Sequence, residues 1–79
     1  MLMEKFLSEL RKGESGVIKK ILDNGPFNRR IRDMGMIPGS IVAVEGVAPL
    51  GDPIQIKIKG CSLALRKDEA QKIVLDVCE

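Results

Sequence analysis

The 79-residue sequence contains no histidine, no tryptophan and no tyrosine, and its only aromatic side chains are Phe6 and Phe27. Histidine is the commonest general base near neutral pH and the commonest metal ligand, so its absence argues against self-sufficient catalysis. With two aromatic rings, the chain has no platform on which nucleic-acid bases or proline-rich peptides could stack. These absences indicate a non-enzymatic protein that acts through its surface.

Cysteine content and charge argue against two further classes of protein. Cys61 and Cys78 lie far apart and form no CxxC pair, so they cannot supply the roughly four ligands of a zinc or iron–sulfur site. We interpret both as reduced thiols, Cys61 packed in a strand and Cys78 near a frayed C-terminus. We therefore expect neither a bound metal nor a cofactor. The net charge of +2 is too small to indicate a nucleic-acid binder, although residues 1–39 carry eight basic and five acidic side chains.

No segment of the sequence is typical of a membrane span or a signal peptide. The longest uncharged stretch, residues 34–44, is interrupted by Gly35, Pro38 and Gly39 and is far shorter than the roughly 20 apolar residues that cross a bilayer. The N-terminus lacks the apolar core and small-residue cleavage site of a signal peptide. We expect one domain, residues 1–79, in a cytoplasmic protein without membrane insertion.

Residue spacing predicts the first two elements of secondary structure. Apolar residues at helical spacing predict one or two helical turns over residues 3–10. The residues at that spacing are Met3, Leu7 and Leu10. The β-branched and aliphatic segment 17–22 follows a glycine-containing turn and predicts a strand.

A helix with clear start and stop signals is expected next. Pro26 suits the first helical position because its missing N–H would have no helical partner there. Phe27, Ile31 and Met34 then fall on one apolar face. Gly35 is placed to adopt the left-handed conformation that ends a helix. The following Pro–Gly pair in residues 37–40 is typical of a type II turn.

The second half of the chain predicts four short strands. They cover residues 41–47, 53–59, 61–66 and 72–77. The first is apolar on both faces, as a central strand would be, whereas the second points Ile54, Ile56 and Ile58 to one side. Asp68 and Gln71 resemble a capping box that opens a single helical turn. The fold class is therefore mainly β: a small barrel of about five strands with one short helix inserted after the first strand and short helical turns.

A cluster of basic residues, Arg29, Arg30 and Arg32, marks the predicted helix. It fits a solvated helix face. It also fits an anchor for carboxylates or phosphates of a partner, because guanidinium groups form bidentate, charge-assisted contacts. Composition alone leaves both interpretations open.

The connection over residues 47–53 carries apolar side chains where polar ones are usual. Val47 and Leu50 could fold back to cover the end of the barrel. Alternatively, the segment is a recognition loop that Pro49 and Pro53 order in advance, which reduces the entropy lost on binding. Both interpretations remain open from the sequence.

Three ordered stretches together resemble the ferrous-iron transport protein A (FeoA) family. Residues 29–39, RRIRDMGMIPG, resemble its RRL-x-x-LG-[LM]-x-PG signature, and residues 49–54 match its PLGDPI loop. Residues 63–70, LALRKDEA, followed by Ile73 and Val74, resemble its LALR-x-x-EA-x-x-I-x-V ending. Ile31 and Met34 stand where leucine is usual, which are volume-conserving changes.

The resemblance implies an SH3-like barrel and a cytoplasmic accessory protein of ferrous iron uptake. It also implies docking on the FeoB-type membrane transporter, at the transporter's cytoplasmic GTP-binding domain. For that docking we expect electrostatic anchors around an apolar centre. The anchors would be Arg29, Arg30 and Arg32, and the apolar centre Val47, Pro49 and Leu50.

Three other functions are weighed against this one. A nucleic-acid-binding barrel could use the same basic helix, but the scarcity of aromatic rings and the small net charge disfavour it. A stand-alone relative of the C-terminal domain of iron-dependent repressors is a second alternative; those repressors carry a helix-turn-helix and metal-binding histidines elsewhere. A carrier of Fe²⁺ is a third, disfavoured because that ion prefers histidine and carboxylate ligands and the acidic residues are scattered.

Overall fold

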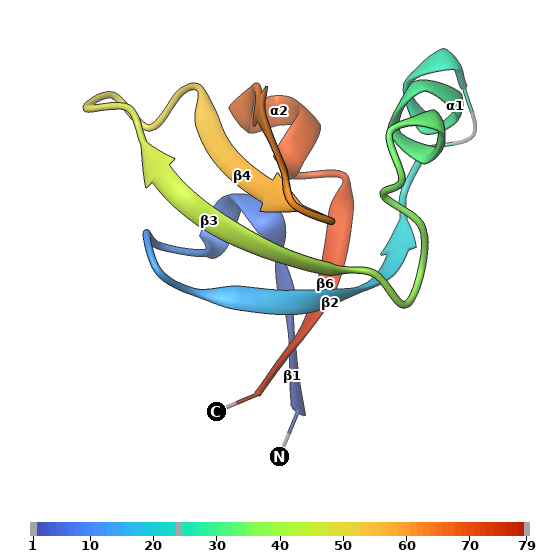
Figure 1. Ribbon diagram of the computed structural model, residues 1–79, viewed down its shortest axis with the longest axis horizontal. Helices are drawn as coiled ribbons and strands as arrows, with labels where there is room; N and C mark the ends of the chain where they lie inside the picture. The colour runs from blue at the N-terminus through green and yellow to red at the C-terminus, as the bar shows by residue number, and fades with distance from the viewer. Residues whose placement is uncertain (1, 24, 79) are drawn as a thin grey trace.

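The protein folds around one six-stranded antiparallel sheet in the strand order β1-β6-β2-β3-β4-β5 (Figure 1). The structure, a computed structural model, describes residues 2–23 and 25–78. Its elements are β1 (Leu2–Phe6), the 3-10 helix η1 (Leu7–Glu9), β2 (Ser15–Ile21), α1 (Pro26–Asp33), β3 (Ile41–Val47), β4 (Ile54–Ile58), β5 (Cys61–Leu65), α2 (Lys67–Ala70) and β6 (Ile73–Cys78). The mainly β fold class with a helix between β2 and β3 is confirmed.

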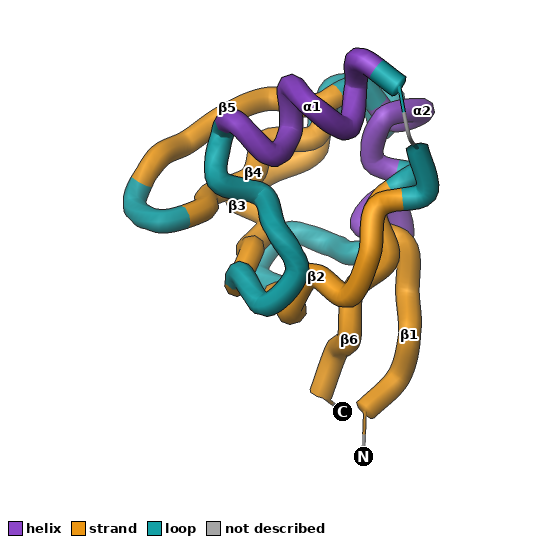
Figure 2. Tube along the Cα trace, turned by 90° about the vertical axis from the view of Figure 1, so that its right-hand side faces the viewer, coloured by secondary structure: helices purple, strands orange, loops and turns teal. Residues whose placement is uncertain are grey.

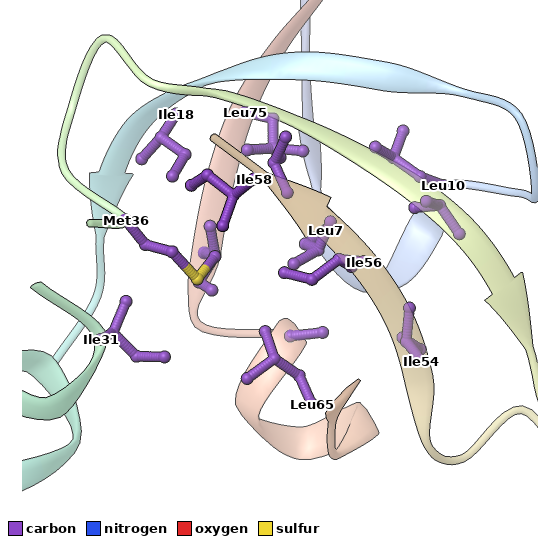
Figure 3. Packing of buried hydrophobic residues seen from close by; sticks show 14 of the residues in the cluster. Leu7, Leu10, Ile18, Ile31, Met36, Ile54, Ile56, Ile58, Leu65 and Leu75 are labelled. Carbon is purple, nitrogen blue, oxygen red and sulfur yellow. The ribbon is translucent and has the colours of Figure 1, made fainter. Parts of the chain in front are cut away.

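The hydrophobic core lies on the concave side of the curved sheet. β4 contributes Ile54, Ile56 and Ile58, which are at most 2% exposed while the residues between them face solvent, so the predicted alternation is confirmed. Irregular pairing in β2, between Ile18 and Lys20, and in β3 bends the sheet, because a bulge increases local twist. Figure 3 shows the aliphatic side chains of several strands meeting Ile31 and Met36 from the α1 region.

The N-terminal segment is a strand, so the prediction of helical turns over residues 3–10 is wrong for its first half. Residues 2–6 pair with β6 in the register Leu2–Cys78 to Phe6–Val74. Only η1 is helical, and Leu7 and Leu10 are buried while Met3 is 40% exposed. A helix of one or two turns is marginal in water, whereas β6 offers a complete hydrogen-bond ladder. The sheet consequently has six strands and not about five.

Two further predictions need correction. β3 lies in the middle of the sheet, but it buries only one face: Val42 and Val44 are buried, whereas Ile41 is 67% exposed. α2 begins at Lys67, and its start is capped by the Glu69 side chain in place of the predicted pair Asp68 and Gln71. Glu69 Oε1 accepts the Arg66 N–H at 3.0 Å.

The molecule has two dissimilar ends. Figures 1 and 2 both show β1 and β6 running together toward the chain termini at one end, with α1 and α2 near the other. Within the described ranges, no helix has the length and apolar character required to cross a membrane. The end that carries the helices also carries the residues considered below.

Candidate functional site

Helix α1 is anchored by its apolar face and by its C-terminal turn. Ile31 is fully buried and Phe27 packs against the core, as predicted. Gly35 adopts φ +93°, and the Met36 N–H donates to the Ile31 carbonyl at 3.1 Å, the pattern of a Schellman turn. Met34 is 44% exposed, so its predicted place on the buried face is wrong; buried Met36 takes that place beside Ile31 (Figure 3).

The three arginines of α1 differ in their surroundings. Arg30 Nη2 forms an ion pair with Glu69 Oε2 at 2.5 Å, and its guanidinium lies 5.9 Å from the centre of the Phe27 ring. Arg29 and Arg32 are exposed, and within the described part of the chain neither side chain forms a hydrogen bond or an ion pair. The two therefore present unengaged guanidinium groups to solvent.

The polar side of α1 borders an open depression. It is lined by Gly25, Pro26, Asn28, Arg29, Arg30, Arg32 and Asp33. All of these residues belong to one helix and the turn before it, so the depression lies between outward-pointing side chains and has no opposing wall among the residues that the structure describes. Such a surface can contact another macromolecule, but it cannot enclose a small substrate.

The β3–β4 loop holds its apolar side chains away from the barrel. Leu50 is 93% exposed and Val47 is 42% exposed, and Pro49 is exposed as well. The interpretation that Val47 and Leu50 cover the end of the barrel is therefore wrong. The loop is nevertheless ordered by its own backbone, because the Ala48 carbonyl accepts the Gly51 N–H at 2.7 Å and the Ala48 N–H donates to the Pro53 carbonyl at 3.1 Å.

The base of this loop is attached to α2. Asp52 Oδ1 accepts the backbone N–H of Lys67, the first residue of α2, at 3.0 Å. The first N–H groups of a helix have no partner within the helix, so the carboxylate satisfies one of them and complements the positive end of the helix dipole. The sequence offered no signal for the attachments made by Asp52 and Glu69, because each links segments far apart in the chain.

The structure does not bring the predicted anchors and the predicted apolar centre into one patch. Figure 1 shows α1 at one end of the longest molecular axis and the β3–β4 loop at the other, with α2 between them. The Cα atoms extend 30 Å along that axis. The predicted site residues thus form two elements: an arginine face on α1 (Arg29, Arg30, Arg32) and an apolar loop (Pro49 and Leu50, with Val47 at the end of β3).

Among the residues that the structure describes, no three Cys, Asp or Glu side chains form a group that could hold a metal ion. Cys61 lies in strand β5 as predicted, but it is exposed and not packed, and Cys78 is also exposed. The two described elements therefore offer contact surfaces, one cationic and one apolar.

Comparison with known proteins gives these surfaces a family context. The family model for the FeoA domain matches residues 6–77. A fusion of Fe(2+) transport protein A with the Fe(2+) transporter FeoB from Porphyromonas gingivalis is 37% identical over 71 residues, which are 90% of this chain. The match spans 8% of the length of that relative.

Solved structures agree with the fold. A FeoA-like protein from Clostridium acetobutylicum superposes with a TM-score of 0.88 at 35% identity, covering 100% of this chain and 92% of that one. FeoA from Stenotrophomonas maltophilia, described as a procaryotic SH3 domain protein and solved with zinc, gives a TM-score of 0.80 at 31% identity, covering 96% and 89%. The chain therefore belongs to the FeoA domain family, whose members take part in ferrous iron transport.

Proposed function

We propose that this chain is a cytoplasmic, non-enzymatic regulator of ferrous iron uptake that docks on a FeoB-type transporter and modulates it. The proposed docking partner is the transporter's cytoplasmic GTP-binding domain. Docking would change nucleotide turnover or gating only to the extent that the chain binds one state of the transporter more tightly than another.

The observation that carries this proposal is the fusion protein of Porphyromonas gingivalis. In that relative, a region 37% identical to this chain is part of the same polypeptide as an Fe(2+) transporter named FeoB. Covalent linkage raises the effective concentration of one module at another, so it is favourable where two modules act on each other. A separate chain would need a binding surface strong enough to replace the linkage.

The two surface elements support the proposal in physical terms. Exposed arginines favour an acidic partner surface and raise the association rate, while a desolvated leucine supplies affinity. The backbone hydrogen bonds of the β3–β4 loop hold Leu50 outward before any partner arrives. Little conformational entropy would then be lost by the loop on docking.

The test is direct binding to the transporter. The purified chain is titrated into the isolated GTP-binding domain of the FeoB-type transporter from the same organism, with calorimetric detection, in the presence of GDP and of a non-hydrolysable GTP analogue. Saturable binding with different affinities in the two nucleotide states is the expected result. The same titration with the detergent-solubilised transporter follows, and an absence of binding to both samples would refute the proposal.

A further inference from the structure

Helix α2 is bonded to both candidate recognition elements. Its first N–H group, that of Lys67, donates to Asp52 at the base of the β3–β4 loop at 3.0 Å. Its third residue, Glu69, pairs with Arg30 of α1 at 2.5 Å. One helix of four residues therefore connects two elements that lie at opposite ends of the longest axis (Figure 1).

A second set of contacts, between two cations and the Phe27 ring, also attaches α1 to the region of α2. The Phe27 ring lies under two cations, with the Arg30 guanidinium 5.9 Å and the Lys72 ammonium 5.2 Å from its centre. Lys72 comes directly before β6. The Phe27 ring therefore links α1, to which it belongs, with the segment between α2 and β6. Cations over an aromatic face add an attraction that depends on position, which fixes α1 relative to α2.

The chemistry of the two elements differs. On α1, Arg29 and Arg32 are the guanidinium groups without an intramolecular partner among residues 2–23 and 25–78. Leu50, at 93% exposure, has apolar surface to bury. Charge complementarity requires carboxylates opposite the arginines, and an apolar socket is required opposite the leucine.

We propose that α2 is a spacer that holds the arginine face and the apolar loop at a fixed separation, so that a protein partner is bound at two separate points. The partner presents carboxylates to Arg29 and Arg32, and an apolar socket to Leu50. Asp52 and Glu69 are positioning residues. Asp52 bonds the loop to the first N–H of α2, and Glu69, within α2, pairs with Arg30 of α1. This inference rests on the proposed function, because the partner used below is the GTP-binding domain of the transporter.

Two-point binding makes a quantitative prediction about the arginine face and Leu50. Effects of mutations at well-separated sites add in free energy, so their changes in Kd multiply. Arg29→Ala with Arg32→Ala should weaken binding about tenfold or more and reduce its dependence on salt. Leu50→Ala should weaken binding about tenfold or more and leave the salt dependence intact. The triple variant should show the product of the two losses.

The spacer makes a second prediction, because two linked contacts bind strongly only while their separation matches the partner. Glu69→Gln retains a side-chain oxygen for the Arg66 N–H but loses the ion pair with Arg30. Asp52→Ala releases the loop from Lys67. Each change should weaken binding several-fold although neither residue belongs to the two contact elements. Urea denaturation of each variant confirms that the chain still folds.

Matched controls separate specific contacts from general changes of charge or hydrophobicity. Lys20→Ala with Lys57→Ala also removes two exposed positive charges, and Ile41→Ala removes an exposed apolar side chain from the sheet. These variants should bind like the original chain. Equal losses from controls and test variants would overturn the inference.

Failure of the inference is distinguishable from failure of the proposed function. If the chain does not bind the transporter at all, the proposed function fails. If it binds, but the arginine and leucine losses do not multiply, or Glu69→Gln and Asp52→Ala bind normally, the function stands and the two-point arrangement is wrong. Binding to phosphatidylserine vesicles in preference to the GTP-binding domain would also overturn the inference, since it would assign the arginines to lipid.

Discussion

Arg30 and Glu69 are 39 residues apart in the sequence and form an ion pair of 2.5 Å between α1 and α2. Glu69 has a second task, because its other carboxylate oxygen accepts the Arg66 N–H at the start of α2. One side chain therefore both begins a helix and attaches a second one. The pair also assigns Arg30 an intramolecular role, whereas the sequence grouped it with Arg29 and Arg32.

Replacing the two partners separately should reveal these two tasks of Glu69. Arg30→Ala removes an ion pair whose side chains are 56% and 20% exposed, so we expect a loss of less than about 1 kcal/mol in the free energy of unfolding. Glu69→Ala also removes the cap acceptor and should cost about 1–2 kcal/mol. Urea denaturation at low salt measures both. Equal losses for the two variants would show that the cap contributes nothing.

Local signals in the sequence were sufficient for much of the fold. The alternating isoleucines of β4 predicted which face is buried, and Gly35 predicted the end of α1, because both features depend on residues close in sequence. The strand at residues 2–6 could not be predicted in the same way. Its partner, β6, lies at the other end of the chain, and pairing with it overrides the weak helical spacing.

The candidate site residues can be selected by type from the sequence, but their arrangement cannot be predicted from it. Arginines beside one another on a helix and apolar residues in a proline-containing loop are visible in the sequence. Whether Leu50 faces solvent or the barrel depends on the turn formed by the Ala48 and Gly51 backbone groups. The separation of the loop from α1 depends on the whole sheet, and residue periodicity carries no information about it.

The left-handed glycine after α1 gives a prediction on backbone conformation. Gly35 has φ +93°, and a Cβ there would lie 3.4 Å from Lys59 Cδ. Gly35→Ala should therefore destabilise the protein by more than about 1 kcal/mol, because alanine is strained at positive φ. Asparagine tolerates this region better, so Gly35→Asn should recover part of the loss. Thermal unfolding of the two variants measures the difference, and an equal Tm for both would argue against backbone strain as the cause.

The Glu4–Lys19 pair across β1 and β2 gives a prediction on pH. The hydrogen bond from Lys19, its positive charge and that of Lys20 lower the pKa of Glu4 below its ordinary value of 4.5. Stabilisation from this carboxylate is therefore present above pH 4.5 and is lost as the pH falls through the lowered pKa. The bond to Glu4 likewise raises the pKa of Lys19 above 10.5, so its contribution is lost only as the pH rises through that raised value.

Carbon-13 NMR of the Glu4 carboxyl group during an acid titration checks this prediction. The midpoint should lie below 4.5 in the original chain and should rise toward it in Lys19→Ala. Lys57→Ala, which removes a positive charge from β4, should leave the midpoint unchanged. A midpoint that does not respond to Lys19→Ala would mean that the two side chains do not pair in solution.

The close approach of β2 to β6 gives a last prediction, on packing at Gly16. A Cβ at this buried position would lie 3.0 Å from the Asp76 carbonyl oxygen, 3.1 Å from Val77 Cγ2 and 3.2 Å from Leu75 Cβ. Because the nearest atom belongs to the backbone, the strands would have to separate, and we expect Gly16→Ala to cost about 1–3 kcal/mol. Gly46→Ala is the matched control, because among the described residues no atom beyond its two chain neighbours lies within 4 Å of its added Cβ. That variant should be neutral or slightly stabilising, since alanine restricts the unfolded chain. Chemical denaturation compares the two, and equal stability would show that β2 and β6 can separate at no cost.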